Sequence, residues 1–305
     1  MGSEGCGRGA EASAFDGRLP SAGTAGEELG TGAYPVRLGD SQACMERNLG
    51  LKYTVRGKGS NDHPDRLKGV EGLINKVVAS AVEALADVPD GATILIGGFG
   101  SAGLPTHLSD ALIVRGARDL TIVNNNAGNG EHGLAALMKA GCVRKIVCSF
   151  PRQVDSWVFD ELWRAGKIEL ELVPQGNLAE RIRAAGAGIG AFYTPTGFGT
   201  ELAKGKETRR IGGRDYVLEY PIHGDYALVA AETGDRWGNL SYRMTARNFG
   251  PIMCMAARIA VAQVHRIVEL GEIDPEHVIT PGIFVQRVVK VDRVRYDPTP
   301  ARRAG

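Results

Sequence analysis

The sequence predicts an α/β fold: an open, mostly parallel sheet flanked by helices. Short apolar runs at 93–96, 120–123, 145–148 and 168–173 alternate with segments of helical apolar spacing. This alternation is typical of βαβ units. The run at 93–96 is continuously apolar, as expected for a strand covered on both faces. Further strand-like runs occur at 216–220, 226–230 and 258–264.

Helices are expected between these strands, where apolar residues recur at helical spacing. The first helical pattern opens at Leu73 and runs to Leu85, and the turn Pro89-Asp90-Gly91 follows it. The remaining helices are expected at 108–115, 133–140, 155–165 and 178–185. In the fourth of these five helices, Trp157, Phe159 and Trp163 are interpreted as core or interface packing.

The composition limits the classes of function. The net charge is +1, with 36 Lys and Arg against 35 Asp and Glu, which argues against a polyanionic partner. Five cysteines without CxxC spacing and scattered histidines predict no disulfide framework and no metal site. No apolar run reaches the roughly 18 residues of a membrane helix, and the N-terminus lacks the apolar region of a signal peptide. We expect a cytoplasmic protein.

The first 72 residues differ in character from the rest. They are rich in Gly, Ala, Ser and Arg and have almost no periodic apolar positions. Such a segment buries too little apolar surface to offset its ordering entropy, so 1–72 is predicted to be a disordered extension. We expect one folded domain at 73–292 and a flexible tail at 293–305, where the sequence is charged and rich in proline.

A glycine-rich loop after the strand at 93–96 is the most informative segment. Gly97, Gly98, Gly100 and Gly103 lie between this strand and the next helix. Glycine lets the backbone turn sharply and approach a ligand, and amide groups at a helix N-terminus can hold an anion. The loop also has the GxGxxG spacing of dinucleotide-binding folds, which need an acidic residue at the end of the second strand. Asp119 precedes that strand, and a tight turn without a ligand is a further alternative.

Several segments together resemble the type I CoA-transferases. Asp90 to Pro105 matches that family's first signature: an Asp-Gly turn, three apolar residues, Gly-Gly-Phe, three residues, Gly, one residue and Pro. The resemblance covers about 73–290 and continues in these stretches: 126–130, 148–153, 173–183, 192–197, 235–240, 247–251 and 279–284. The chain is therefore identified as a member of this family, and it resembles the A subunits.

The resemblance implies a mechanism that needs a second polypeptide. In this family a glutamate of the B subunit, in a Ser-Glu-Asn-Gly type motif, attacks the acyl-CoA thioester. An acyl anhydride and then a glutamyl-CoA thioester form, and the acceptor carboxylate finally takes the CoA. This chain has no such motif, so we expect no catalytic nucleophile in it. Glu131 is the nearest look-alike and is interpreted as a helix-capping residue.

By the same resemblance, the loop is the family's CoA-binding segment: Gly97, Gly98, Phe99, Gly100, Ser101, Ala102 and Gly103. No cofactor or metal is implied, because the CoA thioester is a substrate. A B subunit is implied as the partner, in a heterodimer or an A2B2 assembly. The implied reaction moves CoA from succinyl-CoA to 3-oxoadipate, in aromatic degradation by the β-ketoadipate route. Acetoacetate as acceptor, with succinyl-CoA or acetyl-CoA as donor, is the alternative.

Two functions outside this family remain as alternatives from the residues alone. One is a dinucleotide-dependent oxidoreductase, which the missing acidic residue disfavours. The other is a non-catalytic sensor of nucleotides or sugar phosphates on a similar fold.

Other polar residues have two interpretations. Asn124, Asn125 and Asn126 end a central strand, where ligands gather in open α/β sheets, or they form a local turn. Arg152 and Gln153 suit the acceptor carboxylate or a solvated surface pair. Arg243, Arg247 and Asn248 lie in a stretch shared with the family, and no role is assigned to them.

The start of the folded part also resembles the family. Leu73-Ile74-Asn75-Lys76 stands where A subunits begin with Met-Ile-Asn-Lys or a close variant. A leucine codon can serve as a bacterial start codon. We therefore expect that translation starts at residue 73 and that 1–72 reflects a start site placed too far upstream, with a natural extension as the alternative.

Overall fold

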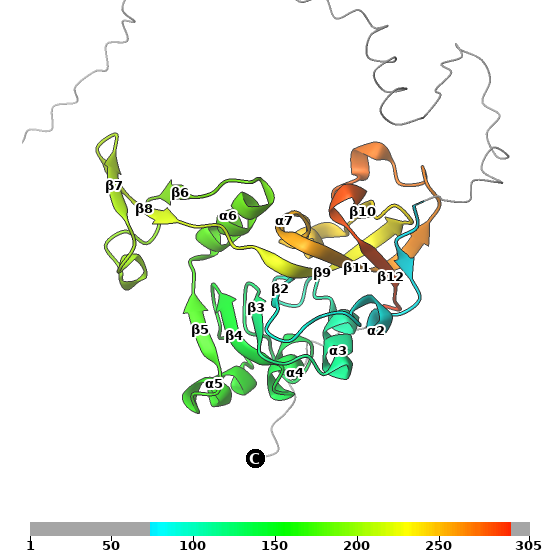
Figure 1. Ribbon diagram of the computed structural model, residues 1–305, viewed down its shortest axis with the longest axis horizontal. Helices are drawn as coiled ribbons and strands as arrows, with labels where there is room; N and C mark the ends of the chain where they lie inside the picture. Colours follow the sequence, from blue (N-terminus) through cyan, green and yellow to red (C-terminus); the bar gives the residue numbers. More distant parts are fainter. Residues whose placement is uncertain (1–73, 294–305) are drawn as a thin grey trace, which may run out of the picture. The chain divides into compact units, whose positions relative to one another are not determined.

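The computed structural model describes residues 74–293, which contain a large sheet covered by helices (Figure 1). The predictions made for 1–72 and for the tail from 294 onward lie outside the described residues. Within this described part of the chain, the main sheet has nine strands. They are β1 (Val77–Val78), β2 (Thr93–Ile96), β3 (Leu120–Val123), β4 (Val143–Cys148), β5 (Glu169–Leu172), β9 (Gly224–Asp235), β10 (Leu240–Ser241), β11 (Ala257–Val268) and β12 (Arg287–Lys290).

The strand order confirms the predicted open, mostly parallel sheet. It runs β1-β12-β11-β9-β2-β3-β4-β5, and β10 pairs with β9. All neighbours are parallel except β10 and β9. From β2 the chain moves outward through β3, β4 and β5, and then returns to β9 on the other side of β2. The boundary between β2 and β9 is thus a topological switch point, where open α/β sheets bind ligands.

Helices cover both faces of the sheet (Figure 1). One face carries α2 (Ala81–Ala84), α3 (Thr106–Arg115), α4 (Leu134–Lys139) and α5 (Trp157–Arg164), and the other carries α6 (Gln175–Gly186) and α7 (Gly250–Ala256). Four short 3₁₀ segments join these elements: η1 (Glu201–Ala203), η2 (Met244–Arg247), η3 (Pro275–His277) and η4 (Gly282–Phe284).

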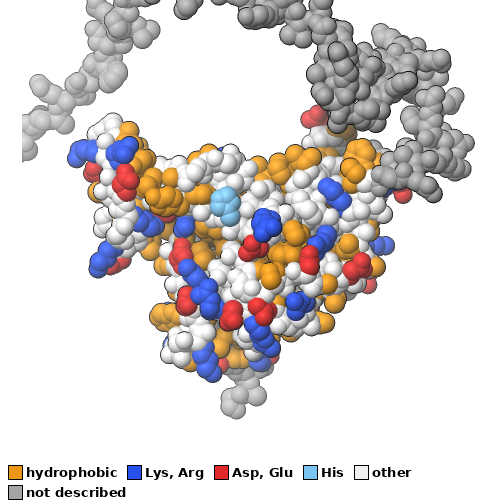
Figure 2. Space-filling model, viewed as in Figure 1, with side chains coloured by type: hydrophobic (Ala, Val, Ile, Leu, Met, Phe, Trp, Pro, Cys, Tyr) orange, Lys and Arg blue, Asp and Glu red, His pale blue; other side chains and the backbone are white. Residues whose placement is uncertain are grey.

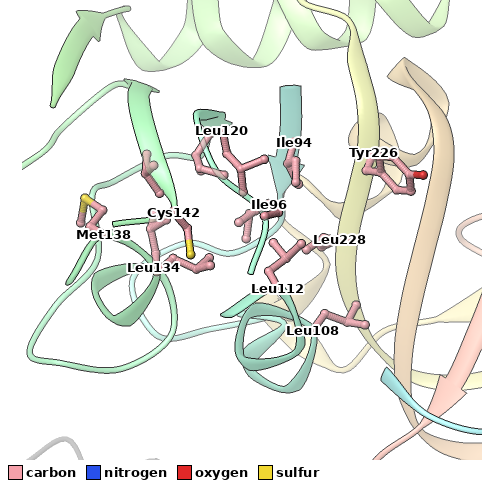
Figure 3. Close-up of a cluster of buried hydrophobic side chains, with 14 of the residues drawn as sticks. Ile94, Ile96, Leu108, Leu112, Leu120, Leu134, Met138, Cys142, Tyr226 and Leu228 are labelled. Atoms are coloured by element: carbon pink, nitrogen blue, oxygen red, sulfur yellow. The ribbon is translucent and has the colours of Figure 1, made fainter. Parts of the chain in front are cut away.

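The core on the α3 face fixes the strand that leads into the glycine loop. Ile94 and Ile96 of β2 are fully or almost fully buried in a cluster with Leu108 and Leu112 of α3 and Leu228 of β9 (Figure 3). Each such side chain contributes about 1.5–3 kcal/mol through the removal of apolar surface from water. The end of β2 is therefore a rigid starting point for the loop.

The prediction of one helix over 73–85 was wrong. The structure has the short strand β1 followed by the four-residue helix α2. Val77 and Val78 pair with Val288 and Val289 of β12, as suits β-branched residues on a pleated surface. The Ser80 hydroxyl then accepts a hydrogen bond from the Glu83 amide and caps α2. Pairing with a strand more than 200 residues away overrode the local helical spacing.

A second sheet of three antiparallel strands extends from the main body at 192–219, and the sequence predicted only its last strand. It contains β6 (Phe192–Thr194), β7 (Thr208–Ile211) and β8 (Arg214–Glu219), in the order β6-β8-β7. All four residues of β7 are exposed. Basic and apolar side chains lie next to each other on this extension, at the left of Figure 2. The sequence of β7 is polar and exposed, so it lacks the apolar run that indicates a buried strand.

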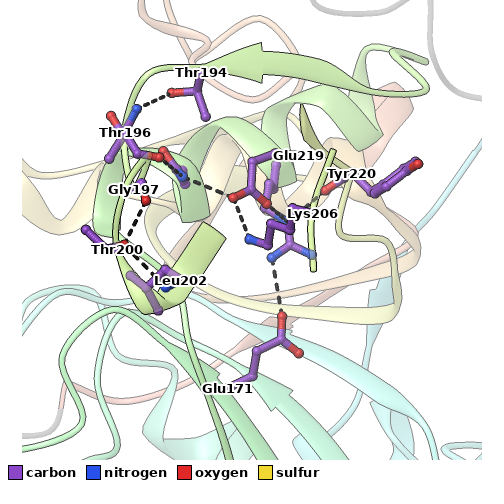
Figure 4. A network of polar contacts seen from close by, with 11 residues as sticks. Glu171, Thr194, Thr196, Gly197, Thr200, Leu202, Lys206, Glu219 and Tyr220 are labelled. Carbon is purple, nitrogen blue, oxygen red and sulfur yellow. Dashed lines mark hydrogen bonds and ion pairs between the residues drawn. The ribbon is translucent and has the colours of Figure 1, made fainter. Parts of the chain in front are cut away.

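A buried carboxylate ties the extension to the main body (Figure 4). Glu219 is 3% exposed, and it accepts hydrogen bonds from the Lys206 ammonium at 2.7 Å and the Asn177 carboxamide at 3.2 Å. The Arg181 guanidinium of α6 lies 3.7 Å from the same carboxylate and 3.3 Å from Glu171 of β5. These contacts satisfy the buried charge and hold β8 against α6. Among the helices of residues 74–293, none is long and apolar enough to cross a membrane.

Candidate functional site

The glycine loop 97–103 lies at the carboxyl end of β2, at the switch point between β2 and β9. The Gly97 amide donates a hydrogen bond to the Leu228 carbonyl of β9, with 2.9 Å between nitrogen and oxygen. From the other side, the Asn124 carboxamide after β3 donates to the Ile96 carbonyl at 2.7 Å. The loop thus starts from a backbone position fixed by both neighbouring strands, at the carboxyl edge of the sheet.

Within the loop, some amides are used and others are free. Phe99 and Ala102 exchange two backbone hydrogen bonds, at 3.0 and 3.1 Å, and close a tight turn. The Gly98 amide donates to the Asn248 side chain at 3.0 Å. Within residues 74–293, the amides of Gly100 and Ser101 donate no hydrogen bond, and both residues lie at the tip of the turn. Adjacent free amides in a turn are suited to hold an anion.

Three glycines of the loop have φ angles that favour glycine. Gly98 has φ 123° and Gly103 has φ 72°, and both are also sterically confined. A Cβ at Gly103 would lie 2.4 Å from the Ala246 carbonyl oxygen, and one at Gly98 would lie 2.5 Å from a Leu104 methyl. Gly100 has φ 59°, and a Cβ there would meet no atom within 4 Å. Space for an approaching ligand therefore lies beside Gly100.

Asn248 holds both ends of the turn. Its Oδ1 atom accepts from the Gly98 amide at 3.0 Å, and its Nδ2 atom donates to the Ala102 carbonyl at 3.0 Å. The same carboxamide accepts from the Phe249 amide at 2.7 Å and donates to the Thr245 carbonyl at 3.0 Å. The sequence placed Asn248 in a shared stretch but indicated no role for it. Its contacts to the loop span about 150 residues, and no local pattern shows them.

The three asparagines after β3 are buried at the same edge and do not act alike. Asn124 supports the loop as described, while Asn125 accepts hydrogen bonds from the Ser149 hydroxyl at 2.8 Å and from the Gln175 carboxamide at 2.9 Å. Asn126 accepts from the Gly128 amide at 2.8 Å. Its Nδ2 atom is buried without a hydrogen-bond partner among the described residues. The local-turn interpretation thus fits Asn126 in part.

Gln175 is a residue of this edge that the sequence did not single out. It begins α6, and its side chain reaches Asn125 at the carboxyl edge. The only indication of Gln175 in the sequence is its position after the predicted strand at 168–173. Other polar residues share that position, so it does not distinguish Gln175 from them.

The remaining candidates lie apart from this cluster or on the surface. Glu131 forms an exposed ion pair with Lys139 at 2.9 Å, and α4 has no side-chain cap, so the capping interpretation was wrong. Arg152 pairs with Asp160 at 2.7 Å and lies over the Trp163 ring, which favours the surface interpretation. Arg243 and Arg247 are exposed.

The buried thiols of the described residues are not activated nucleophiles. Removal from water raises the pKa of Cys148 and of Cys254 to about 12, and it also raises the pKa of Cys142. A thiol with a raised pKa is protonated at neutral pH and reacts slowly. Within residues 74–293, no group of three His, Cys, Asp or Glu side chains is placed to hold a metal ion.

The open, mostly parallel sheet, with a glycine turn at the switch point between β2 and β9, defines the class of fold. The chain belongs to the Coenzyme A transferase family, whose model matches residues 78–291. A dinucleotide-binding site would need a carboxylate at the end of the second strand. Asp119 is exposed and lies before β3, away from this edge, so it does not supply that carboxylate.

The chain is similar to curated A subunits over nearly their whole length. It is 70% identical over 219 residues to the A subunit of 3-oxoadipate CoA-transferase from Pseudomonas putida, covering 72% of this chain and 95% of that protein. The protein of the same name from Acinetobacter baylyi is 64% identical over 232 residues, covering 76% and 100%. The A subunit of the succinyl-CoA:3-ketoacid coenzyme A transferase of Helicobacter pylori is 45% identical, covering 76% and 100%.

A solved structure has the same fold. An acyl-CoA transferase from Escherichia coli O157:H7, crystallised as a thioester complex with CoA, superposes with a TM-score of 0.62 at 24% identity. The match covers 76% of this chain and 49% of that chain.

Proposed function

We propose that this chain is the A subunit of a two-subunit CoA-transferase that converts succinyl-CoA and 3-oxoadipate into succinate and 3-oxoadipyl-CoA. Residues 73–292 supply the transferase domain, and the loop 97–103 binds the CoA thioester. The observation that carries the proposal is the pair of free amides at Gly100 and Ser101, at the switch point of a CoA-transferase fold.

The loop suits the charge that develops in each chemical step. The partner's glutamate attacks the thioester carbonyl, whose oxygen becomes negative before the CoA thiolate leaves and an anhydride remains. The thiolate then attacks the glutamyl carbonyl, releases succinate and leaves a glutamyl-CoA thioester. In the second half of the reaction, the acceptor carboxylate attacks the glutamyl-CoA thioester and releases the CoA thiolate, which leaves a new anhydride. The thiolate then attacks the acceptor's acyl carbonyl, which forms 3-oxoadipyl-CoA and frees the glutamate. Fixed amide donors stabilise such an oxygen without reorganising at the moment of reaction.

We infer 3-oxoadipate as the acceptor from the sequence identities to the relatives. The two proteins named for 3-oxoadipate are 70% and 64% identical to this chain, against 45% for the one named for 3-ketoacids. Acetoacetate has one carboxylate, whereas 3-oxoadipate has a second one that can be held by hydrogen-bond donors at the carboxyl edge. The exposed Gln175 carboxamide, which lies at this edge, is the candidate for this contact.

The proposal includes a B subunit, in a heterodimer or A2B2 assembly, and no cofactor or metal. The family and the naming of the relatives as A subunits support a partner polypeptide. The partner would supply the nucleophilic glutamate, and the glycine loop would face it.

The test is an assay of the purified chain with and without a B subunit of the same genome. Formation of 3-oxoadipyl-CoA from succinyl-CoA is measured by chromatography, and acetoacetate is compared as acceptor. We expect transfer only with both subunits, with a higher kcat/KM for 3-oxoadipate. Transfer by the isolated chain, or a preference for acetoacetate, would contradict the proposal.

A further inference from the structure

The glycine turn is held partly by a segment distant in the sequence. Only the two hydrogen bonds between Phe99 and Ala102 close it internally. Its first and last parts are joined instead by one side chain from a distant segment, because Asn248 accepts from Gly98 and donates to Ala102, both at 3.0 Å. The amides of Gly100 and Ser101 lie between these two contact points.

The Asn248 carboxamide uses its oxygen and both of its N–H groups in hydrogen bonds, and its segment is anchored in the core. Its acceptor oxygen takes the Gly98 and Phe249 amides, and its two donor hydrogens go to Ala102 and Thr245. Phe249 is 7% exposed and precedes α7, whose Met253 is buried in the core. The carboxamide is thus fixed to the core on the α7 face and cannot rotate without losing four hydrogen bonds.

Close packing reinforces the same contact. A Cβ atom at Gly103 would lie only 2.4 Å from the Ala246 carbonyl oxygen. The loop and the segment before Asn248 are therefore already in close contact. A change of position in either segment therefore moves the other.

We propose that Asn248 is a positioning residue for CoA transfer: its carboxamide sets the spacing of Gly98 and Ala102 and so aims the Gly100 and Ser101 amides at the thioester oxygen. This inference rests on the proposed function. Asn248 itself acts through the loop and touches no reacting atom.

Two variants of this chain, each assayed in the two-subunit complex, test this role. In Asn248→Ala both loop contacts disappear, and we expect kcat to fall about 30-fold or more, with KM for either substrate changed less than about 3-fold, because fixed donors act mainly on the transition state. In Asn248→Asp the carboxylate still accepts from Gly98 but repels the Ala102 carbonyl. Protonation at lower pH restores a donor, so the ratio of this variant's kcat to that of the wild type should rise as the pH falls.

Asn239→Ala is the matched control. Asn239 also joins two loops, since it accepts from the Gly282 amide at 2.8 Å and donates to Asp235 at 2.8 Å, but it does not contact the glycine turn. Its loss should lower the melting temperature with kcat retained within about 3-fold. A merely structural Asn248 would behave like this control.

The outcomes are distinct. The inference is overturned if folded Asn248→Ala keeps its kcat, or if its loss appears only in KM. If that variant does not fold, a flat kcat ratio across pH for Asn248→Asp overturns it. Absence of CoA transfer by the wild-type complex would instead refute the proposed function.

Discussion

The Gly97 amide nitrogen lies 2.9 Å from the Leu228 carbonyl oxygen, and this hydrogen bond joins β2 to β9 where the order of the sheet reverses. In open α/β sheets, ligands bind outside the carboxyl ends of the strands at such a reversal. Apart from the half-exposed Phe99, the turn that follows Gly97 has only small side chains, and the amides of Gly100 and Ser101 lie at its tip.

Filling the space beside Gly100 should stop transfer without unfolding the chain. We expect Gly100→Val to lower kcat/KM at least about 100-fold, because the side chain enters the open space beside the turn and shifts its donors. The left-handed φ of 59° adds about 1–2 kcal/mol of strain.

Gly116→Val controls for that strain. Gly116 ends α3 with φ 73° and nothing within 4 Å, at the end of the helix away from the glycine loop. Both variants should lose similar stability in thermal unfolding and still bind the B subunit, and only Gly100→Val should lose transfer. Equal activity of the two variants would show that the turn does not meet the substrate.

Loss of the buried Glu219 carboxylate should destabilise the three-stranded extension. We expect Glu219→Ala to lower the free energy of unfolding by about 2–4 kcal/mol, because Lys206 and Arg181 lose their shared partner inside the protein. Chemical denaturation measures this. Glu201→Ala, which breaks the exposed pair with Lys204, should change stability by less than about 0.5 kcal/mol. Similar costs for both variants would mean that the buried network does not hold the extension.

The ion pair between Asp87 and Arg287 should make stability depend on acid pH. Hydrogen bonding from the Arg287 guanidinium lowers the pKa of Asp87 from 3.8 to about 2. Since the folded-state pKa is below the unfolded value, the stabilisation is complete above about pH 4 and is lost as the pH falls toward 2. Asp87 is half exposed, so screening reduces the effect to roughly 1 kcal/mol or less.

The measurement is the free energy of unfolding of wild type and Asp87→Asn between pH 7 and pH 2. The variant should be less stable at pH 7, and the difference should shrink as the pH approaches 2. A constant difference over this range would mean that the ion pair does not exist in solution.

The repeating pattern of strands and helices predicted the sheet and the glycine loop because both depend on local sequence. The apolar runs before Gly97 and Asn124 mark buried parallel strands, and the glycines between Ile96 and Pro105 require a turn. A loop that directly follows a parallel strand lies at the carboxyl edge of the sheet, as the structure shows for 97–103.

What the sequence could not predict depends on contacts between distant segments. The β1 pairing with β12, the Asn248 clamp on Gly98 and the Gln175 contact with Asn125 join residues separated by 50 to more than 200 positions. β7 was missed for a different reason, since its exposed residues have no buried face that would impose an apolar pattern. The CoA-binding role of the loop stays a prediction.

Hydrogen–deuterium exchange of the complex of both subunits, with and without succinyl-CoA, tests that role most directly. If the tip of the turn holds the thioester, the backbone amides of Gly100 and Ser101 should exchange more slowly when ligand is bound, while the amides of Phe99 and Ala102 change little. Slower exchange elsewhere in the complex, with Gly100 and Ser101 unaffected, would contradict the account.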